Sequence, residues 1–176
     1  MKNLLLIIDY QNDFVTGSLG FEAAALLEPR IVEKIEQYLE RGDDIAFTLD
    51  THHENYLATQ EGRNLPVLHC ISGTEGHLLY GEVARYLDRG KSFLKPTFGS
   101  ETLFKHLLGG SYEKIELVGL VSNICVLSNA VICKTALPEA EIVVDAMCTA
   151  SFDSALHEKA LDVLEGLQVK ITGRMR

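Results

Sequence analysis

Short apolar runs alternate along the chain with stretches in which apolar residues recur every three to four positions. Continuous runs are typical of strands buried on both faces, and the recurring spacing is typical of amphipathic helices. The pattern predicts strands at residues 4–8, 45–49, 92–94, 115–120, 142–144 and 169–171, and helices at residues 31–39, 78–87, 102–108, 123–137 and 155–164. Because crossovers between parallel strands are almost always right-handed, this alternation predicts an α/β protein with helices on both faces of a parallel sheet.

Polar and reactive side chains stand at the carboxyl ends of four predicted strands. Asp9 follows the first strand, Asp50 and His52 follow the second, Lys95 follows the third, and Cys125 lies shortly after the fourth. In an open parallel sheet, ligands bind at this edge, where the strand order reverses. The pattern therefore predicts that these residues share one functional site.

Composition and charge narrow the class of protein. The 176 residues, 47% hydrophobic and 23% charged, predict one soluble domain over residues 1–176. The net charge of −9 disfavours a nucleic-acid partner, because it repels phosphate backbones. We find no stretch that resembles a signal peptide or is long enough to span a membrane, and we expect no membrane partner. Four cysteines without paired spacing indicate free thiols and predict a cytoplasmic protein.

Three of the site residues suggest nucleophilic catalysis. A thiol in the first turn of a helix lies at the positive end of the helix dipole, which predicts a favoured thiolate at Cys125. Taken singly, the residues have simpler explanations: a buried free cysteine, a turn-forming Asp9 and a solvated Lys95. Taken together, they suit an enzyme in which Asp9 takes the thiol proton, Lys95 stabilises charge and Cys125 attacks a carbonyl carbon.

Several segments resemble the isochorismatase-like cysteine hydrolases. Residues 9–14 (DYQNDF) resemble the opening motif of this family, residues 95–98 its lysine segment, residues 121–125 its nucleophile loop, and Asp145-Ala146 with His157 its closing segment. The resemblance covers essentially the whole chain. It implies a three-layer α/β/α sandwich with a six-stranded parallel sheet, and a cis peptide between Leu120 and Val121. It also implies an oxyanion hole formed by the backbone N–H groups of Val121 and Cys125.

The same resemblance suggests which side chains contact the substrate. It implies that Phe14 packs against the substrate ring. We expect Phe98 or Tyr56 to supply the second wall, and we include Phe98 and Leu120 in the substrate site. Pro66 stands where many nicotinamidases have a tryptophan, which weakens the case for nicotinamide as the substrate but not the case for hydrolysis.

A metal site is expected beside the triad. Asp50-Thr51-His52, followed by His69-Cys70, resembles the metal-binding region of nicotinamidases. The resemblance implies a divalent ion held by Asp50, His52 and His69. Ala58 stands where many members carry a further histidine, and Glu61 is placed to replace it. Such ligands suit Zn²⁺, with Mn²⁺ or Fe²⁺ as alternatives. The alternative is that these residues only order the loop; His53 and His77 are expected to face solvent.

The function expected from these patterns is a nicotinamidase-like amidohydrolase. It would convert nicotinamide or a similar small amide to the acid and ammonia through a thioester. An amidase for another small amide or ureide is one alternative, although such enzymes often lack the metal motif. A true isochorismatase is disfavoured because it needs no thiol, and a catalytically silent binding protein is the alternative from another class. A homo-oligomer is expected, of a size that the sequence does not fix.

Overall fold

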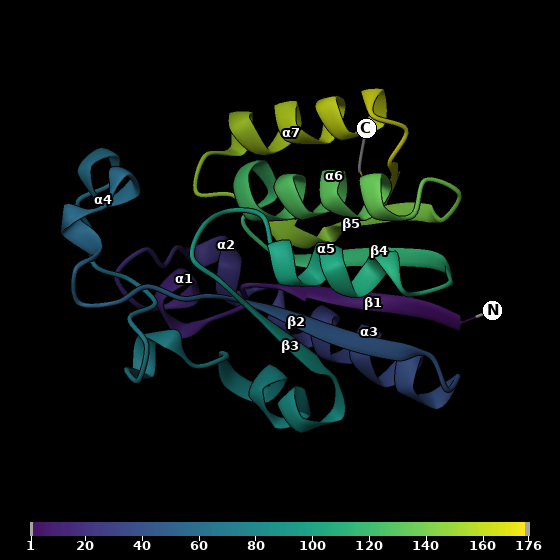
Figure 1. The fold of residues 1–176 in the computed structure, drawn as a ribbon, viewed down its shortest axis with the longest axis horizontal. Helices are drawn as coiled ribbons and strands as arrows, with labels where there is room; N and C mark the ends of the chain where they lie inside the picture. The colour runs from purple at the N-terminus through teal and green to yellow at the C-terminus, as the bar shows by residue number, and fades with distance from the viewer. Residues whose placement is uncertain (1, 175–176) are drawn as a thin grey trace.

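A six-stranded sheet with the order β3-β2-β1-β4-β5-β6 forms the centre of the computed structural model, which describes residues 2–174 (Figure 1). The strands are β1 (Lys2–Ile8), β2 (Asp44–Asp50), β3 (Lys91–Lys95), β4 (Tyr112–Leu120), β5 (Glu141–Ala150) and β6 (Lys170–Thr172). Every pair of neighbouring strands is parallel, which confirms the predicted α/β class. The strand order reverses between β1 and β4, and the carboxyl edge there is the expected ligand position.

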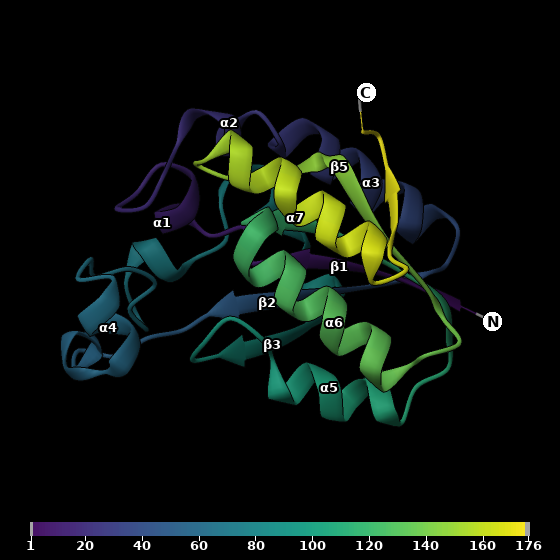
Figure 2. The same ribbon diagram turned by 90° about the horizontal axis from the view of Figure 1, so that it is seen from above.

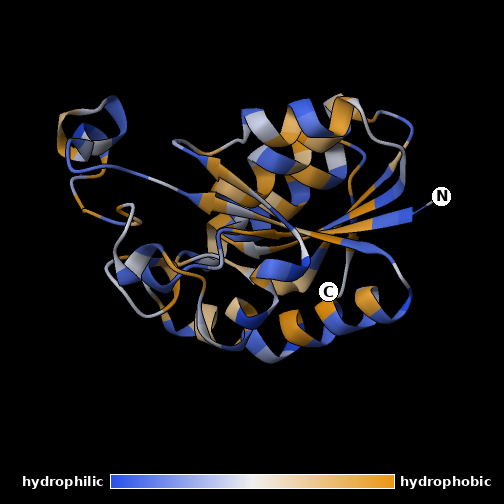
Figure 3. Ribbon diagram, turned by 60° about the horizontal axis from the view of Figure 1, so that its bottom comes forward, coloured by the Kyte–Doolittle hydropathy of each residue, from blue (hydrophilic) through white to orange (hydrophobic). Residues whose placement is uncertain are grey.

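Helices cover both faces of the sheet and complete a three-layer sandwich (Figures 1 and 2). One face carries α5 (Glu101–Leu108), α6 (Leu127–Ala136) and α7 (Ser154–Gly166), and the other carries α1 (Asn12–Val15), α2 (Glu22–Ala25), α3 (Glu28–Glu40) and η3 (Gly81–Arg89). Each face has its own apolar core, and Figure 3 shows hydrophobic residues concentrated along the central strands. In α3 the buried Ile31, Ile35 and Tyr38 form one apolar side, as their spacing predicts. No helix within residues 2–174 is long and apolar enough to cross a membrane.

Connections at the carboxyl edge carry short helical turns. The β2–β3 connection contains η1 (Tyr56–Ala58), α4 (Gln60–Asn64) and η2 (Glu75–His77), and α4 projects from the body of the molecule (Figure 1). The helix predicted at 78–87 begins only at Gly81 and is a 3₁₀ helix. Residues 78–80 cannot join it, because Leu79 forms a bridge with Gln11 and the Tyr80 N–H donates to the Tyr10 carbonyl (2.9 Å).

Two further elements differ from their predicted forms. The helix predicted at 123–137 starts with a π-helical turn, η4 (Ser122–Val126), in which the Val126 N–H donates to the Val121 carbonyl (3.2 Å). β5 extends well beyond residues 142–144. Its register against β4 is irregular, since Leu117 pairs with Val144 but Gly119 pairs with Thr149. This bulge interrupts the apolar run, so the sequence pattern did not predict the second half of the strand.

Gly119 lets β4 lie close against β1. Its φ is +105°, and a Cβ there would meet the Ile8 carbonyl oxygen far inside contact distance. We expect Gly119→Ala to lower the free energy of unfolding by about 3 kcal/mol, from backbone strain and overpacking together. Urea unfolding would measure the change. The matched control is Gly166→Ala at the end of α7, where nothing lies within 4 Å of the added Cβ. Equal stability of the two variants would contradict this account.

Candidate active site

The residues of the predicted triad converge at the carboxyl edge of the sheet. Asp9 directly follows β1, Lys95 ends β3, and Cys125 lies in the η4 turn that follows β4. Asp50, which ends β2, pairs with Lys95 in the strand register. The three triad side chains are buried, so their charges interact in a medium that screens them poorly. The convergence expected from the strand ends is therefore present.

Lys95 is the centre of this cluster. Its Nζ lies 2.7 Å from Asp9 Oδ2, 3.2 Å from Asp50 Oδ1 and 3.4 Å from Cys125 Sγ, and it donates to the Thr97 carbonyl (2.9 Å). Burial alone would lower the pKa of Lys95, but the charges of Asp9 and Asp50 raise it well above its usual range. Lys95 is therefore a fixed cation between two carboxylates and the thiol, and not the solvated lysine of the simpler explanation.

Asp9 is held in a constrained position beside the lysine. Its backbone has a φ of +45°, in the left-handed region, and its side chain is fully buried. The Thr48 hydroxyl donates to Asp9 Oδ1 (2.6 Å), while Oδ2 faces Lys95. Burial raises the pKa of Asp9, although Lys95 acts in the opposite direction. A carboxylate with a raised pKa is a stronger base, which suits the removal of a proton from a thiol.

Burial at Cys125 opposes the thiolate that the helix position was expected to favour. Burial raises the pKa of Cys125 well above its usual range, and Asp9 raises it further, whereas Lys95 lowers it. The first turn after β4 is a π turn with Cys125 buried in it, so desolvation acts against the charged form of the thiol. Attack by Cys125 therefore requires transfer of its proton to a neighbouring base.

The backbone around Cys125 is fixed by side chains from other elements. The Leu120–Val121 peptide is cis, as the resemblance implied. Asn129 Nδ2 donates to the Cys125 carbonyl (2.8 Å) and to the Phe98 carbonyl (3.0 Å), which ties the nucleophile turn to the lysine segment. The buried Ser122 hydroxyl lies 2.9 Å from His157 Nδ1 on α7. An oxyanion hole at the Val121 and Cys125 N–H groups remains a prediction.

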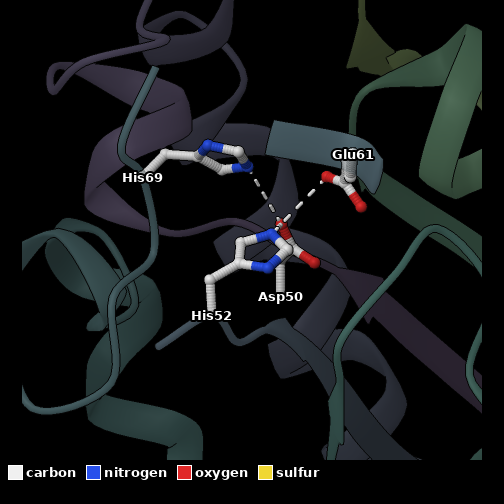
Figure 4. A group of neighbouring side chains, drawn as sticks. All are labelled: Asp50, His52, Glu61 and His69. Atoms are coloured by element: carbon white, nitrogen blue, oxygen red, sulfur yellow. Dashed lines mark hydrogen bonds and ion pairs between the residues drawn. The ribbon is translucent and has the colours of Figure 1, made fainter. Parts of the chain in front are cut away.

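Four acidic and histidine side chains gather beside the triad. Atoms of Asp50, His52, Glu61 and His69 that are able to bind a metal all lie within 4.8 Å of one another (Figure 4). Asp50 Oδ2 is 3.0 Å from His52 Nε2 and 3.4 Å from His69 Nε2, and His52 Nε2 is 3.6 Å from Glu61 Oε1. His69 Nδ1 lies 2.8 Å from the Val67 carbonyl, which leaves Nε2 for a ligand bond. Two imidazoles and two carboxylates fit Zn²⁺, Mn²⁺ or Fe²⁺.

The negative charge of this four-residue group also favours the binding of a cation. Burial acts to raise the pKa of Asp50, but hydrogen bonds from the two histidines and the charge of Lys95 hold that pKa below its usual range. Burial and the charge of Asp50 raise the pKa of Glu61. Asp50 is thus ionised and links the two halves of the site, because Oδ1 contacts Lys95 while Oδ2 faces the histidines. A divalent cation would relieve the repulsion between the two carboxylates.

A cavity of about 590 Å³ opens above these groups. It is lined by Phe14, Leu19, Asp50, Gln60, Glu61, Asn64, Leu65, His69, Phe98, Val121, Ile124, Cys125 and Phe152. Phe14 and Phe98 both line this cavity, and their contact with a substrate remains a prediction. Leu120 does not line the cavity: its side chain is fully buried in the core, which corrects its predicted contact with the substrate. Tyr56 is outside this lining, with its ring centroid 4.5 Å from that of His52 and 5.0 Å from that of His69.

Several side chains that support the site were missed. Gln11 Nε2 donates to the Asp50 carbonyl (2.9 Å), and its Oε1 accepts from the Asp50 N–H (2.7 Å), so it fixes the backbone of a candidate ligand. Asp13 Oδ2 accepts from the Cys70 N–H (2.7 Å) and holds the segment after His69. Both belong to the motif at residues 9–14, which was the available signal. His77 was expected in solvent, but it is partly buried and lies 2.9 Å from the Thr51 hydroxyl.

Comparisons with family models, curated proteins and solved structures all match this chain to isochorismatase-family proteins. Residues 3–174 match the model of the isochorismatase domain. A curated Bacillus subtilis (strain 168) protein, named as an uncharacterized isochorismatase family protein PncA, is 31% identical, over 92% of this chain and 93% of its own. The crystal structure of nicotinamidase/pyrazinamidase PncA from Bacillus subtilis has a TM-score of 0.88 at 30% identity and covers 98% of this chain and 100% of its own. That of pyrazinamidase/nicotinamidase from Streptococcus mutans UA159 has a TM-score of 0.87 at 27% identity, with coverage of 97% and 99%.

Proposed function

The chain belongs to the isochorismatase family, and we propose that within it the protein is a cysteine-dependent amidohydrolase that acts on nicotinamide or a similar small amide. Its similarity to nicotinamidases and pyrazinamidases makes it a hydrolase of amide carbon–nitrogen bonds. The observation that carries the finer proposal is the position of Lys95 Nζ, within 3.4 Å of both Asp9 and Cys125, at a cavity that Cys125 itself lines. A binding protein without catalytic activity does not require the contacts that Lys95 makes with the buried Asp9 carboxylate and the Cys125 thiol.

The proposed reaction has two halves. Asp9 takes the proton of Cys125, and the sulfur attacks the carboxamide carbon, while the N–H groups of Val121 and Cys125 hold the oxyanion. The carbon–nitrogen bond then breaks, ammonia leaves with the proton from Asp9, and a thioester remains. In the second half Asp9 takes a proton from water and the hydroxide oxygen attacks the thioester carbon. The carbon–sulfur bond breaks, the carboxylic acid is released, and Asp9 returns the proton to the Cys125 sulfur. Lys95 stays protonated and offsets the charge that moves between Asp9 and Cys125.

Asp50, His52, Glu61 and His69 would hold the divalent cation, with Zn²⁺ the ion that this donor set suits best. When bound, the ion supplies a Lewis acid that orients the substrate through a ring nitrogen or a carbonyl oxygen. Asp50 and His69 belong to the same cavity lining as Cys125, so an amide that reaches the thiol would lie beside these two candidate ligands.

The charge of the cavity favours a neutral amide over an acidic substrate. Its lining includes Asp50 and Glu61 but no lysine or arginine from the described residues 2–174. The two carboxylates would balance the charge of a bound divalent ion, so an acidic ureide or isochorismate would bring its own carboxylates into this cavity without a cationic side chain to pair them. Lys95 is already paired with Asp9 and Asp50 below the thiol. An amidase for another neutral small amide is therefore the nearest alternative.

Metal content tests the proposed ligands. We expect purified protein to contain about one divalent ion per chain, and His52→Ala to weaken its binding by about a hundredfold, because one buried imidazole ligand is lost. Elemental analysis and competition with a chelator would measure this. His53→Ala is the matched control, since His53 is the exposed neighbour of His52 and lies outside the four-residue group. Equal metal retention by both variants would show that these side chains only order the loop.

A further inference from the structure

We propose that the mouth of the active-site cavity is a subsite for an apolar substituent on the acyl side of the amide, and that Phe152 sets the preference for substrates that carry one. This inference rests on the proposed function and specifies its substrate class. The mouth is defined here as an apolar rim formed by Leu65, Phe98 and Phe152. They come from three separate segments: the residue that follows α4, the β3–α5 connection and the β5–α7 connection.

The lining has a buried floor that holds the reacting groups and an exposed, mainly apolar rim, to which Gln60 and Asn64 of α4 add two amide side chains. Cys125, Asp50 and His69 are buried, with exposed fractions of 6%, 4% and 3%. The rim side chains are exposed by 38% (Leu65), 45% (Phe98) and 64% (Phe152). The floor holds the reacting groups, so the carboxamide lies there. Any further part of the substrate extends toward the rim.

The size of the cavity leaves room for such an extension. About 590 Å³ lies within the range of roughly 300–1,000 Å³ that is typical of sites for drug-sized ligands. A single pyridine ring with its carboxamide fills only part of this volume. Leu65, Phe98 and Phe152 make the rim mainly apolar despite the amides of Gln60 and Asn64, and no lysine or arginine of residues 2–174 lines the cavity. The group that fills the remainder is therefore uncharged and mainly apolar.

Phe152 is held at the mouth. Its ring meets the edge of Phe21 at a centroid distance of 6.5 Å and an interplanar angle of 82°. Phe21 itself packs against the core beneath α2. The next residue, Asp153, caps α7 by accepting from the N–H groups of Ala155 (2.9 Å) and Leu156 (3.0 Å), which fixes the chain on the other side. An aromatic ring that is anchored and yet 64% exposed offers a preformed apolar surface to a ligand.

The test compares nicotinamide with 5-phenylnicotinamide, whose phenyl group lies away from both the carboxamide and the ring nitrogen. We expect kcat/KM of the metal-loaded wild-type enzyme to be about tenfold higher for the phenyl compound. In Phe152→Ala this ratio falls to about one, and Phe152→Leu gives an intermediate ratio. Leu26→Ala is the control, because Leu26 is 70% exposed but outside the cavity lining, and the ratio stays near ten.

The outcomes separate the two proposals. If amides are hydrolysed but the phenyl compound has no advantage, or Phe152→Ala keeps it, the rim subsite is wrong while the proposed function stands. If neither amide is hydrolysed, nicotinamide-like amides are not substrates and this part of the proposed function is wrong. The subsite is then decided by calorimetric binding of both compounds to Cys125→Ala, with and without Phe152→Ala. Tighter binding of the phenyl compound that depends on Phe152 would support the subsite, and equal binding would overturn it.

Discussion

Cys125→Ala is expected to reduce amide hydrolysis by a factor on the order of 10⁴ or more, because it removes the atom that forms the thioester. The fold should survive, since Cys125 is a small buried residue of an apolar core cluster and alanine leaves the backbone unchanged. Ammonia release from nicotinamide would measure the loss, and thermal unfolding would confirm that the variant is folded.

Cys133→Ala is the matched control for this variant. Cys133 is also a fully buried thiol of the same core cluster, and it lies on α6, outside the cavity lining. We expect it to lose some stability and to keep kcat within about threefold of the wild type, because its thiol contacts no substrate. Near-native turnover by Cys125→Ala, or equal losses in the two variants, would contradict a cysteine nucleophile.

Asp9→Asn is expected to lower kcat by roughly 10²- to 10⁴-fold, because the amide keeps the shape of the carboxylate but accepts no proton. The Thr48 hydroxyl still has an oxygen to donate to, so the local packing is preserved. The dependence of the rate on pH shows whether the loss of activity comes from the loss of a base. A base must be ionised, so the rate falls as the pH drops through its pKa. Burial raises the pKa of Asp9, which moves this acid limb above the usual range of an aspartate.

The profile of kcat/KM against pH should therefore lose its acid limb in Asp9→Asn. The limb belongs to the coupled Asp9–Lys95–Cys125 unit and not to one isolated carboxyl group. Asp43→Asn is the control, because Asp43 pairs with Asn3 at the opposite end of the sheet. It should leave the limb in place. An unchanged acid limb in Asp9→Asn would assign the base to another residue.

Much of the fold was predictable because the central strands are buried on both faces. The run at residues 4–8 predicted most of β1, whose residues from Leu4 onward are buried. The site was predictable for a related reason: Asp9, Asp50 and Lys95 directly follow or end apolar runs, and parallel strands bring such ends together. The bulged half of β5 was missed because Asp145 and the irregular register interrupt the apolar pattern.

The unpredicted features depend on packing between distant segments. The raised pKa of Cys125 follows from its burial beside Asp9, which no local pattern encodes. Leu120 is in the core and Val121 lines the cavity, although they are neighbours in sequence. The contact of Phe152 with Phe21 joins the β5–α7 connection to a loop before α2, far away in the chain. The residue types at the strand ends thus predicted the reacting groups. They did not predict which side chains line the cavity, because that depends on packing between distant segments.

The central claim is the thioester at Cys125, and the most direct measurement is its capture. The metal-loaded enzyme would be mixed with nicotinamide, quenched in acid within milliseconds to seconds, and digested for mass spectrometry. We predict that the peptide containing Cys125 carries the mass of the nicotinoyl group, that hydroxylamine removes it, and that Cys125→Ala shows no such adduct at any site. Ammonia release by the wild-type enzyme, with no acyl group on Cys125 at any quench time and no burst of ammonia ahead of the acid, would contradict the account.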